Sequence, residues 1–221
     1  MLNRISAILC LLAVLLGLSS CALLNPQTEV SGSEYTCRLY GRTILRRIEV
    51  ISDGQKVAVL GVGDARADMQ NCKFELVDLN FDGHEDFRFI VSRKAEGIKY
   101  RCWLWNPASK TFIVDNTLNS LLSPAIDYEA KTISAPYRTY TIEPAVGTEP
   151  ETYISEVGVL TYKWRQGRLV AVKKECRTYY SETEIYCVAT WDINDDGELE
   201  PTVERWLTPE QYERAGYPPI D

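Results

Sequence analysis

From residue 35 onward the sequence is dominated by short runs in which apolar and polar residues alternate, and turn residues separate these runs. Tyr35 to Tyr40, Tyr100 to Trp105 and Leu169 to Lys174 are examples. A period of two is typical of β-strands that bury one face. Asp53-Gly54 and Gln166-Gly167 each stand between two such runs, where they favour tight hairpin turns. We therefore expect a mainly β fold of antiparallel sheets.

Helical signals are few and lie mostly at the end of the chain. Thr208 can cap a helix, Pro209 suits its first position, and Gln211 completes a T-x-x-Q capping box. This pattern predicts a short C-terminal helix. A short helical turn is expected over Leu118–Leu122, and residues 143–153 are the most loop-like internal stretch.

The first four residues carry one positive charge, at Arg4. A run from Ile5 to Leu18 follows that is almost wholly apolar and too short to predict a membrane-spanning helix. Leu18-Ser19-Ser20-Cys21 follows, and this order resembles a bacterial lipoprotein signal. The resemblance implies cleavage after residue 20 and lipidation of Cys21. Ala22, rather than aspartate, follows the cysteine, which implies the periplasmic face of the outer membrane. An ordinary signal peptide or an uncleaved anchor remains the alternative.

These signals divide the chain into a signal peptide over residues 1–20, a lipidated cysteine and tether over 21–33, and a β domain over 34–221. About 200 residues remain after cleavage, which suits one domain or two small ones. Cleavage removes Arg4, so 23 basic and 31 acidic side chains remain and the net charge is −8. An acidic body argues against nucleic acid as a partner and leaves room for cations or basic proteins.

Five cysteines follow the lipidation site, and export permits disulfides. Cys176 and Cys187 form the first predicted pair, because both lie in strand-like runs around a turn. Cys72 and Cys102 form the second, and Cys37 is left over. The absence of C-x-x-C, and of any histidine besides His84, argues against a metal-thiolate site.

Two segments share the pattern D-x-N-x-D-G-x-x-[DE], which is typical of a calcium loop. Oxygens at positions 1, 3, 5 and 9 converge on the ion, position 7 offers its carbonyl, and glycine at position 6 permits a sharp turn. The candidate ligands are Asp78, Asn80, Asp82, His84 and Asp86 in the first loop and Asp192, Asn194, Asp196, Glu198 and Glu200 in the second.

Neither segment is an EF-hand, because position 12 is Phe89 in the first loop and Val203 in the second. Strand-like runs also flank the first loop. We expect Ca²⁺ in a structural role, holding clustered carboxylates and fixing a hairpin. The alternative is a plain turn, since Asx side chains bond their own backbone and glycine takes positive φ.

The sequence offers little for catalysis. His84 is the sole histidine, which excludes H-E-x-x-H and leaves only those Ser-His-Asp or Cys-His schemes that are built around His84 itself. A carboxylate pair acting on a glycosidic bond has no fixed spacing and stays open, but we expect no enzyme activity. We expect the strand aromatics to be core and sheet-face residues, with a sugar-binding platform as the minor alternative. These aromatics are Trp103, Trp105, Tyr162, Trp164, Tyr186 and Trp191.

Three stretches together resemble a family of periplasmic, β-propeller-like calcium-loop lipoproteins. They are FELVDLNFDGHEDFRFI with the following KYRCWLWNPASKTFIV, LNSLLSPAIDYEAKTISA, and LTYKWRQGRLVAVKK, within residues 70–175. The resemblance implies an incomplete propeller-like fold and a calcium loop at Asp78, Asn80, Asp82 and Asp86. The family includes an immunity protein that inhibits a lysozyme-like peptidoglycan hydrolase. The second loop and the cysteines depart from the family pattern.

Two functions follow from these expectations. The first is a protein-binding lipoprotein that acts as an immunity protein against a peptidoglycan hydrolase, since most such hydrolases are basic and an acidic inhibitor would be steered toward them. The second is a structural or scaffold lipoprotein of the envelope, with architectural calcium loops and no inhibitory activity.

Overall fold

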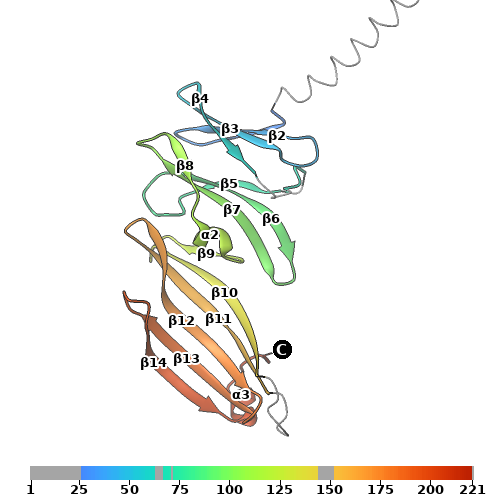
Figure 1. The fold of residues 1–221 in the computed structure, drawn as a ribbon, viewed down its shortest axis with the longest axis vertical. Coiled ribbons are helices and arrows are strands. Elements are labelled where there is room, and N and C mark those ends of the chain that lie inside the picture. Colours follow the sequence, from blue (N-terminus) through green and yellow to red (C-terminus); the bar gives the residue numbers. More distant parts are fainter. Residues whose placement is uncertain (1–25, 63–66, 71, 144–151, 221) are drawn as a thin grey trace, which may run out of the picture. The chain divides into compact units, whose positions relative to one another are not determined.

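A computed structural model describes residues 26–62, 67–70, 72–143 and 152–220 (Figure 1). The predicted signal peptide and Cys21 lie outside the described residues. The chain divides into two compact units, residues 1–114 and 115–221. Residues 34–221 were predicted to form one β domain, but the chain divides into two units after Val114.

Unit 1 consists of two antiparallel four-stranded sheets, in which each strand lies beside its neighbours in sequence. The first sheet contains β1 (Thr28–Ser31), β2 (Thr36–Tyr40), β3 (Arg47–Ser52) and β4 (Gln55–Gly61). The second contains β5 (Phe74–Val77), β6 (Asp86–Lys94), β7 (Gly97–Asn106) and β8 (Thr111–Ile113). The predicted hairpin turn joins β3 to β4, and Asp53 and Gly54 both have the positive φ that such a turn requires.

The two sheets of unit 1 share one hydrophobic core. Cys37, Leu39 and Ile48 enter it from the first sheet, and Phe87 and Trp103 enter from the second. Alternate residues of β2 and β3 are buried, as the period of two predicted. Burial of one such large side chain contributes roughly 1.5–3 kcal/mol relative to leaving it exposed.

The end of the predicted tether belongs to unit 1. Residues 28–31 form β1, which pairs with β2 in the register Val30↔Cys37 and Ser31↔Thr36. The tether prediction over 21–33 was therefore wrong for these residues. The residues that suggested a tether, Asn25, Pro26, Gln27 and Gly32, flank this strand in the sequence, and pairing with β2 gives its backbone groups partners that composition does not reveal.

Unit 2 contains one antiparallel sheet of six strands in the order β14-β13-β12-β11-β10-β9. The strands are β9 (Ala125–Asp127), β10 (Thr132–Glu143), β11 (Thr152–Arg165), β12 (Arg168–Tyr180), β13 (Ile185–Ile193) and β14 (Leu199–Leu207). β12 is longer than the alternating run from Leu169 to Lys174 that the sequence shows. The part of the predicted loop at 144–151 lies outside the described residues.

Because directly paired residues point to the same side, register assigns the side chains of this sheet to two faces. Tyr137, Gly158, Cys176 and Ala189 are in register on one face, here called the cysteine face. Tyr140, Ser155, Tyr179 and Tyr186 are in register on the other, here called the tyrosine face.

Two short helices complete unit 2. α2 (Asn116–Ser120) is capped by the Asp115 side chain, and Leu121 behind it lines a shallow pocket with Ala135 and Tyr137 of the cysteine face. α3 (Pro209–Arg214) begins at Thr208 with the predicted capping box, so the C-terminal helix is confirmed. The prediction of a mainly β fold with antiparallel sheets is also confirmed, whereas its propeller-like arrangement stays a prediction.

Candidate metal loops and polar clusters

The first acidic loop joins β5 to β6, so strands flank it as predicted. Asp78 accepts hydrogen bonds from the backbone nitrogens of Asp82 and Gly83, at 3.2 and 3.0 Å. The same Asp82 nitrogen lies 3.3 Å from the Asn80 side-chain oxygen. Oxygens from positions 1 and 3 therefore converge on one N–H. Gly83 has φ +90°, which the pattern requires of its sixth position.

Asp86, at position 9, is fully buried beneath this loop. Its carboxylate accepts hydrogen bonds from the backbone nitrogens of Leu79 at 2.7 Å and Trp105 at 2.8 Å. Burial raises the pKa of Asp86 to about 7, although both hydrogen bonds act in the opposite direction. Asp86 thus joins the loop to β7 through backbone contacts.

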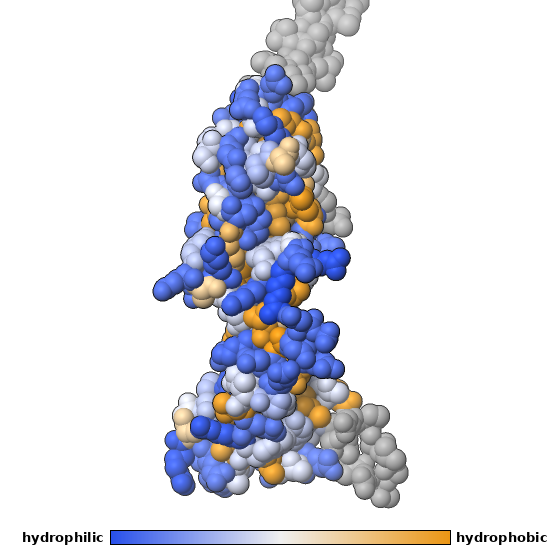
Figure 2. Space-filling model, turned by 90° about the vertical axis from the view of Figure 1, so that its left-hand side faces the viewer, coloured by the Kyte–Doolittle hydropathy of each residue, from blue (hydrophilic) through white to orange (hydrophobic). Residues whose placement is uncertain are grey.

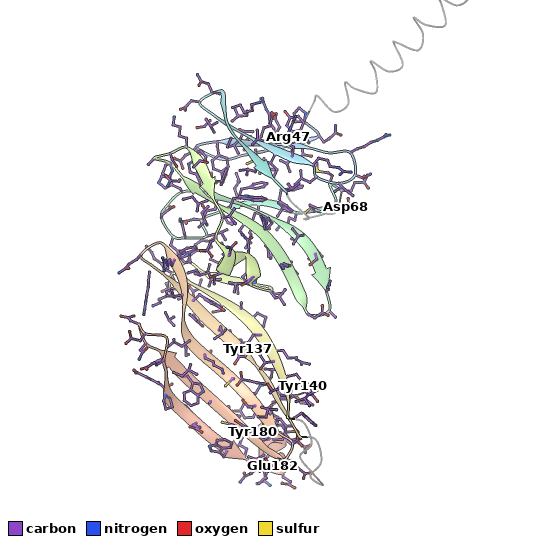
Figure 3. The ribbon with its side chains drawn as sticks, in the orientation of Figure 1. Arg47, Asp68, Tyr137, Tyr140, Tyr180 and Glu182 are labelled. Atoms are coloured by element: carbon purple, nitrogen blue, oxygen red, sulfur yellow. The ribbon has the colours of Figure 1, made fainter. Side chains whose placement is uncertain are left out.

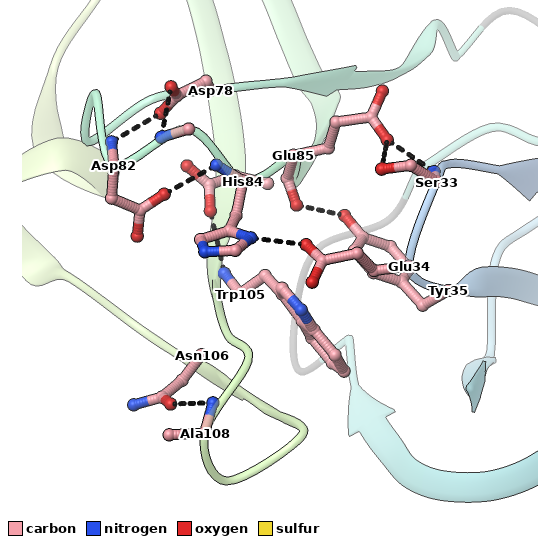
Figure 4. A network of polar contacts seen from close by, with 12 residues as sticks. Ser33, Glu34, Tyr35, Asp78, Asp82, His84, Glu85, Trp105, Asn106 and Ala108 are labelled. Carbon is pink, nitrogen blue, oxygen red and sulfur yellow. Dashed lines mark hydrogen bonds and ion pairs between the residues drawn. The ribbon is translucent and has the colours of Figure 1, made fainter. Parts of the chain in front are cut away.

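His84 and Glu85 turn away from the loop and contact the segment between β1 and β2 (Figure 4). His84 Nδ1 lies 2.7 Å from a Glu34 carboxylate oxygen. Glu85 accepts a hydrogen bond from the Ser33 backbone nitrogen at 2.8 Å, and its carbonyl accepts one from the Tyr35 hydroxyl at 2.7 Å. A Cβ at Gly32 would come within 2.4 Å of the Glu85 carboxylate, so a larger residue there would displace the Glu85 side chain from its present position.

The second acidic loop joins β13 to β14, again between strands. Its Asn194 side-chain oxygen accepts hydrogen bonds from the backbone nitrogens of Asp196 and Glu198, at 3.0 and 2.9 Å. The amide nitrogen of Asn194 faces carboxylate oxygens of Glu198 and Glu200. Asp192 pairs across the hairpin with Glu200.

The two loops place their asparagine in the same way. The Asn80 amide nitrogen donates to an Asp82 carboxylate oxygen at 2.8 Å, and the Asn194 amide nitrogen faces carboxylate oxygens of Glu198 and Glu200. A cation in either loop would require the asparagine to present its oxygen where its nitrogen now lies, and in the first loop Asp86 is committed to backbone nitrogens. Within the described residues, no group of three or more histidines, cysteines, aspartates or glutamates stands at metal-binding distances.

The predicted disulfides are absent, since the five cysteines after Cys21 are all described and all thiols. Cys72 packs against the core that contains Trp103, and Cys102 precedes Trp103 in β7 and therefore faces the other side of the sheet. Cys176 is opposite Ala189 and Cys187 is opposite Thr178, so these two cysteines are diagonal neighbours. Diagonal Cα atoms lie roughly 7–8 Å apart, beyond the usual reach of a disulfide.

Sequence reasoning missed a polar cluster on the cysteine face. The Glu156 carboxylate accepts hydrogen bonds from the Tyr137 hydroxyl at 2.9 Å and the Thr178 hydroxyl at 3.1 Å, and it pairs with the Lys174 ammonium at 3.0 Å. Burial acts to raise the pKa of Glu156, but Lys174 and the hydroxyls outweigh it and lower the pKa. The Tyr137 ring lies over Gly158, where a Cβ would come within 2.8 Å of it.

The tyrosine face carries a continuous row of rings, which sequence reasoning also missed. Adjacent ring centroids lie 4.0–5.9 Å apart across four strands, α3 and the residues after it. This tyrosine row consists of Tyr140, Tyr153, Tyr179, Tyr186, Tyr212 and Tyr217. Tyr212 is buried at the α3 end, whereas Tyr140 is 58% exposed at the β10 end. Only strand register could have grouped these residues.

The predicted roles of the tryptophans in unit 1 are confirmed, because Trp103 and Trp105 are buried in its core. Tyr186 and Trp191 pack on opposite faces of the sheet in unit 2. Hydrophilic residues predominate on the face of the molecule seen in Figure 2, where hydrophobic residues form separate patches. The described residues include no helix long and apolar enough to cross a membrane.

Comparison with known proteins gives little. No protein-family model matches the chain, and no curated protein matches it. A solved structure of a Xanthomonas type IV secretion system related protein is similar over 80% of this chain and 86% of its own chain, with 15% sequence identity and a TM-score of 0.44. The family resemblance seen in the sequence therefore stays a prediction.

Proposed function

We propose that this chain is an exported, lipid-anchored protein that binds another protein, and that the partner is a basic peptidoglycan hydrolase which it inhibits. The proposal gives the chain no catalytic activity of its own. Two features of the sequence support it: the signal-like segment that ends at Cys21, and the net negative charge of the residues that follow.

The observation that carries the proposal is the uneven distribution of charge between the two units. Unit 2, residues 115–221, contains ten lysines and arginines and nineteen aspartates and glutamates, a net charge of −9. Residues 26–114 contain thirteen basic and twelve acidic side chains, a net charge of +1. One unit therefore carries the whole acidic excess, and such a field accelerates encounter with a positively charged protein.

Ca²⁺ has a structural role in this proposal. Bound by the first loop through Asp78, Asn80 and Asp82, Ca²⁺ would supply positive charge to clustered carboxylates. It would also hold the loop whose next residues, His84 and Glu85, contact the β1–β2 segment. Unit 2 would remain the binding surface, because the first loop lies in unit 1.

The test is inhibition of peptidoglycan digestion. The mature chain from residue 21, with Cys21→Ser to keep it soluble, is titrated into digestions by several basic peptidoglycan hydrolases, including a chicken-type lysozyme and any encoded beside the gene. Inhibition that weakens as salt rises is expected, since screening reduces steering by unit 2. Unchanged digestion by every hydrolase in the series would refute inhibition.

A second function is favoured by one observation, namely that the first loop uses its polar groups internally. Asp78 and Asp86 bond backbone nitrogens, and Glu85 bonds Ser33. A scaffold lipoprotein of the envelope, with architectural loops, has the same internal bonds. Chemical cross-linking in intact cells distinguishes the two, because a scaffold is captured with envelope components and without any hydrolase.

A further inference from the structure

Packing within unit 2 does not explain why one end of the tyrosine row is exposed. Burying an aromatic ring is favourable, yet Tyr140 is 58% exposed and Tyr153 is 37% exposed. Their rings stack at 5.4 Å with 28° between the planes. Ile142, two residues from Tyr140 on the same face, is 52% exposed. These side chains form an apolar, aromatic surface at one end of the sheet.

Acidic residues border this surface. The turn after β12 is fixed against Tyr153, because Ser181 Oγ accepts a hydrogen bond from the Tyr153 nitrogen and the Ser181 nitrogen donates to the Tyr153 carbonyl. Glu182 and Glu184 follow in that turn. Figure 3 shows Tyr140 and Glu182 toward the same end of the unit 2 sheet. Burial raises the pKa of Tyr179, and neighbouring groups including Glu184 raise it further, so the field of this carboxylate reaches the row.

The rest of the row holds the exposed rings in place. Tyr179 and Tyr186 pair across β12 and β13, and Tyr186 stacks on Tyr212 of α3 at 4.0 Å. Arg177 donates hydrogen bonds to the Tyr212 hydroxyl and the Pro218 carbonyl, which fixes α3 on this face. A preordered aromatic surface loses little conformational entropy on binding, and tyrosine is enriched where proteins bind each other.

The open edge of β10 lies beside the exposed rings. β9 pairs with β10 only over Thr132–Ser134. Among the described residues, β10 has no strand partner on that side from Tyr137 to Ile142. An extended segment of another protein can therefore lie along β10 while its side chains reach Tyr140 and Ile142.

We propose that Tyr140, Ile142, Tyr153, Glu182 and Glu184 form a docking surface for a basic segment of a partner protein. Arginine or lysine side chains of the partner stack over the two tyrosine rings, and their charges are met by the two glutamates. The net charge of −9 on unit 2 selects a cationic partner. Arg138, one position nearer the middle of the sheet on the same face, limits the surface on that side. The docking surface depends on the proposed function only for the identity of the partner.

The first experiment uses a probe that needs no knowledge of the partner. An extended hexa-arginine peptide is titrated into the mature chain with Cys21→Ser, and binding is measured by calorimetry. The variants Tyr140→Leu and Tyr153→Leu, made together, keep apolar bulk but remove both π faces. They should weaken binding about tenfold. Tyr128→Leu is the matched control, because Tyr128 is a 54% exposed tyrosine of the same unit outside the row.

A charge variant provides an independent readout. Glu182→Gln with Glu184→Gln should weaken peptide binding severalfold and reduce its salt dependence, whereas Glu129→Gln, at an exposed site in the β9–β10 turn, should change neither. Thermal unfolding midpoints show that each variant is folded. Peptide binding that is absent, or that is equal in the leucine double variant and the wild type, overturns the surface. Binding of a chitin hexasaccharide that requires both tyrosines overturns it too, in favour of a glycan platform.

Hydrolase inhibition separates this inference from the proposed function. If no hydrolase is inhibited but the peptide binds through the tyrosines, the docking surface stands and the hydrolase is the wrong partner. If a hydrolase is inhibited equally by the wild type and by the leucine double variant, inhibition stands and the docking surface is wrong. If inhibition falls in the leucine double variant and not in Tyr128→Leu, both stand.

Discussion

Asp86 and Glu156 are both carboxylates that are partly or fully removed from water, but the pKa of Asp86 is raised and the pKa of Glu156 is lowered. Two backbone N–H groups contact Asp86, and burial still raises its pKa to about 7. Glu156 contacts the Lys174 ammonium, and its pKa is lowered. The difference follows from burial and from charge. Asp86 is more deeply buried than Glu156, and Asp78 and Asp82 add negative charge near it, whereas the positive charge of Lys174 compensates Glu156 for lost hydration.

Substitutions of Asp86 test its two hydrogen bonds. Asp86→Ala leaves the backbone nitrogens of Leu79 and Trp105 buried without an acceptor, which should lower the free energy of unfolding by about 3 kcal/mol. Asp86→Asn keeps one acceptor oxygen but turns an amide nitrogen, a donor, toward the other backbone N–H, so it should destabilise the protein less than Asp86→Ala without being neutral. Urea unfolding measures both. Equal losses would show that the retained acceptor oxygen does not stabilise the fold.

Glu156 predicts a pH dependence of stability. Its pKa is lower in the folded protein than the ordinary 4.5, so its contribution to the free energy of unfolding is complete above pH 4.5 and disappears as the pH falls through the folded-state pKa. Glu156→Gln should be less stable than the wild type at neutral pH, and this gap should narrow in acid. Urea unfolding at several pH values tests this, with Glu129→Gln as an exposed control. A gap that is constant with pH would contradict the prediction.

Among the strands, turns and helices, features that depend on a few adjacent residues were predictable from the sequence. Features that depend on which residues of two strands pair were not. Asp53-Gly54 forms its hairpin turn, and Thr208 and Gln211 form their capping box, because each depends on a few adjacent residues. The tyrosine row joins Tyr140 to Tyr186 through the pairing of long strands, and no local pattern specifies that pairing. The disulfide predictions failed for the same reason, since register makes Cys176 and Cys187 diagonal neighbours instead of a direct pair, and Cys102 faces away from the core against which Cys72 packs.

The acidic loops predict a response to calcium. A loop without the twelfth ligand should bind in the range of ~10⁻⁴–10⁻³ M. At about ten times the dissociation constant, bound calcium adds about 1.4 kcal/mol to the free energy of unfolding. The thermal midpoint should therefore rise in excess calcium relative to excess chelator. Asp78→Asn with Asp82→Asn should remove the rise if the first loop causes it. Identical midpoints in calcium and chelator would mean that Asx hydrogen bonds alone hold both loops.

At the scale of the whole molecule, the two units are built differently. Unit 1 buries its apolar side chains between two sheets, whereas unit 2 has a single sheet whose faces are covered largely by its own aromatic rings and short helices. Composition predicted enough chain for one domain or two, but it could not locate the boundary at Val114 or the charge difference between the units. The boundary depends on which strands share a core.

The predicted lipoprotein signal can be tested on the whole chain. Expressed in a bacterium with labelled palmitate, the wild-type chain should incorporate label and sediment with membranes, because acyl chains on Cys21 bury many methylene groups in the bilayer. Cys21→Ser should incorporate no label. Cys37→Ser, at a buried cysteine of unit 1, should be labelled normally. A wild-type chain without label would refute lipidation.

The positions of two prolines affect whether neighbouring copies of the chain can pair through their strand edges. Pro201 lies in β14, one terminal strand of the unit 2 sheet, and Pro136 lies in β10 just beyond the short pairing with β9. Each ring removes an N–H from its strand, and such prolines on edge strands oppose pairing with a neighbouring copy at that position. If the chain is anchored at Cys21 as proposed, its copies would meet more often in two dimensions than in free solution, and the two missing N–H groups would then oppose edge-to-edge polymerisation.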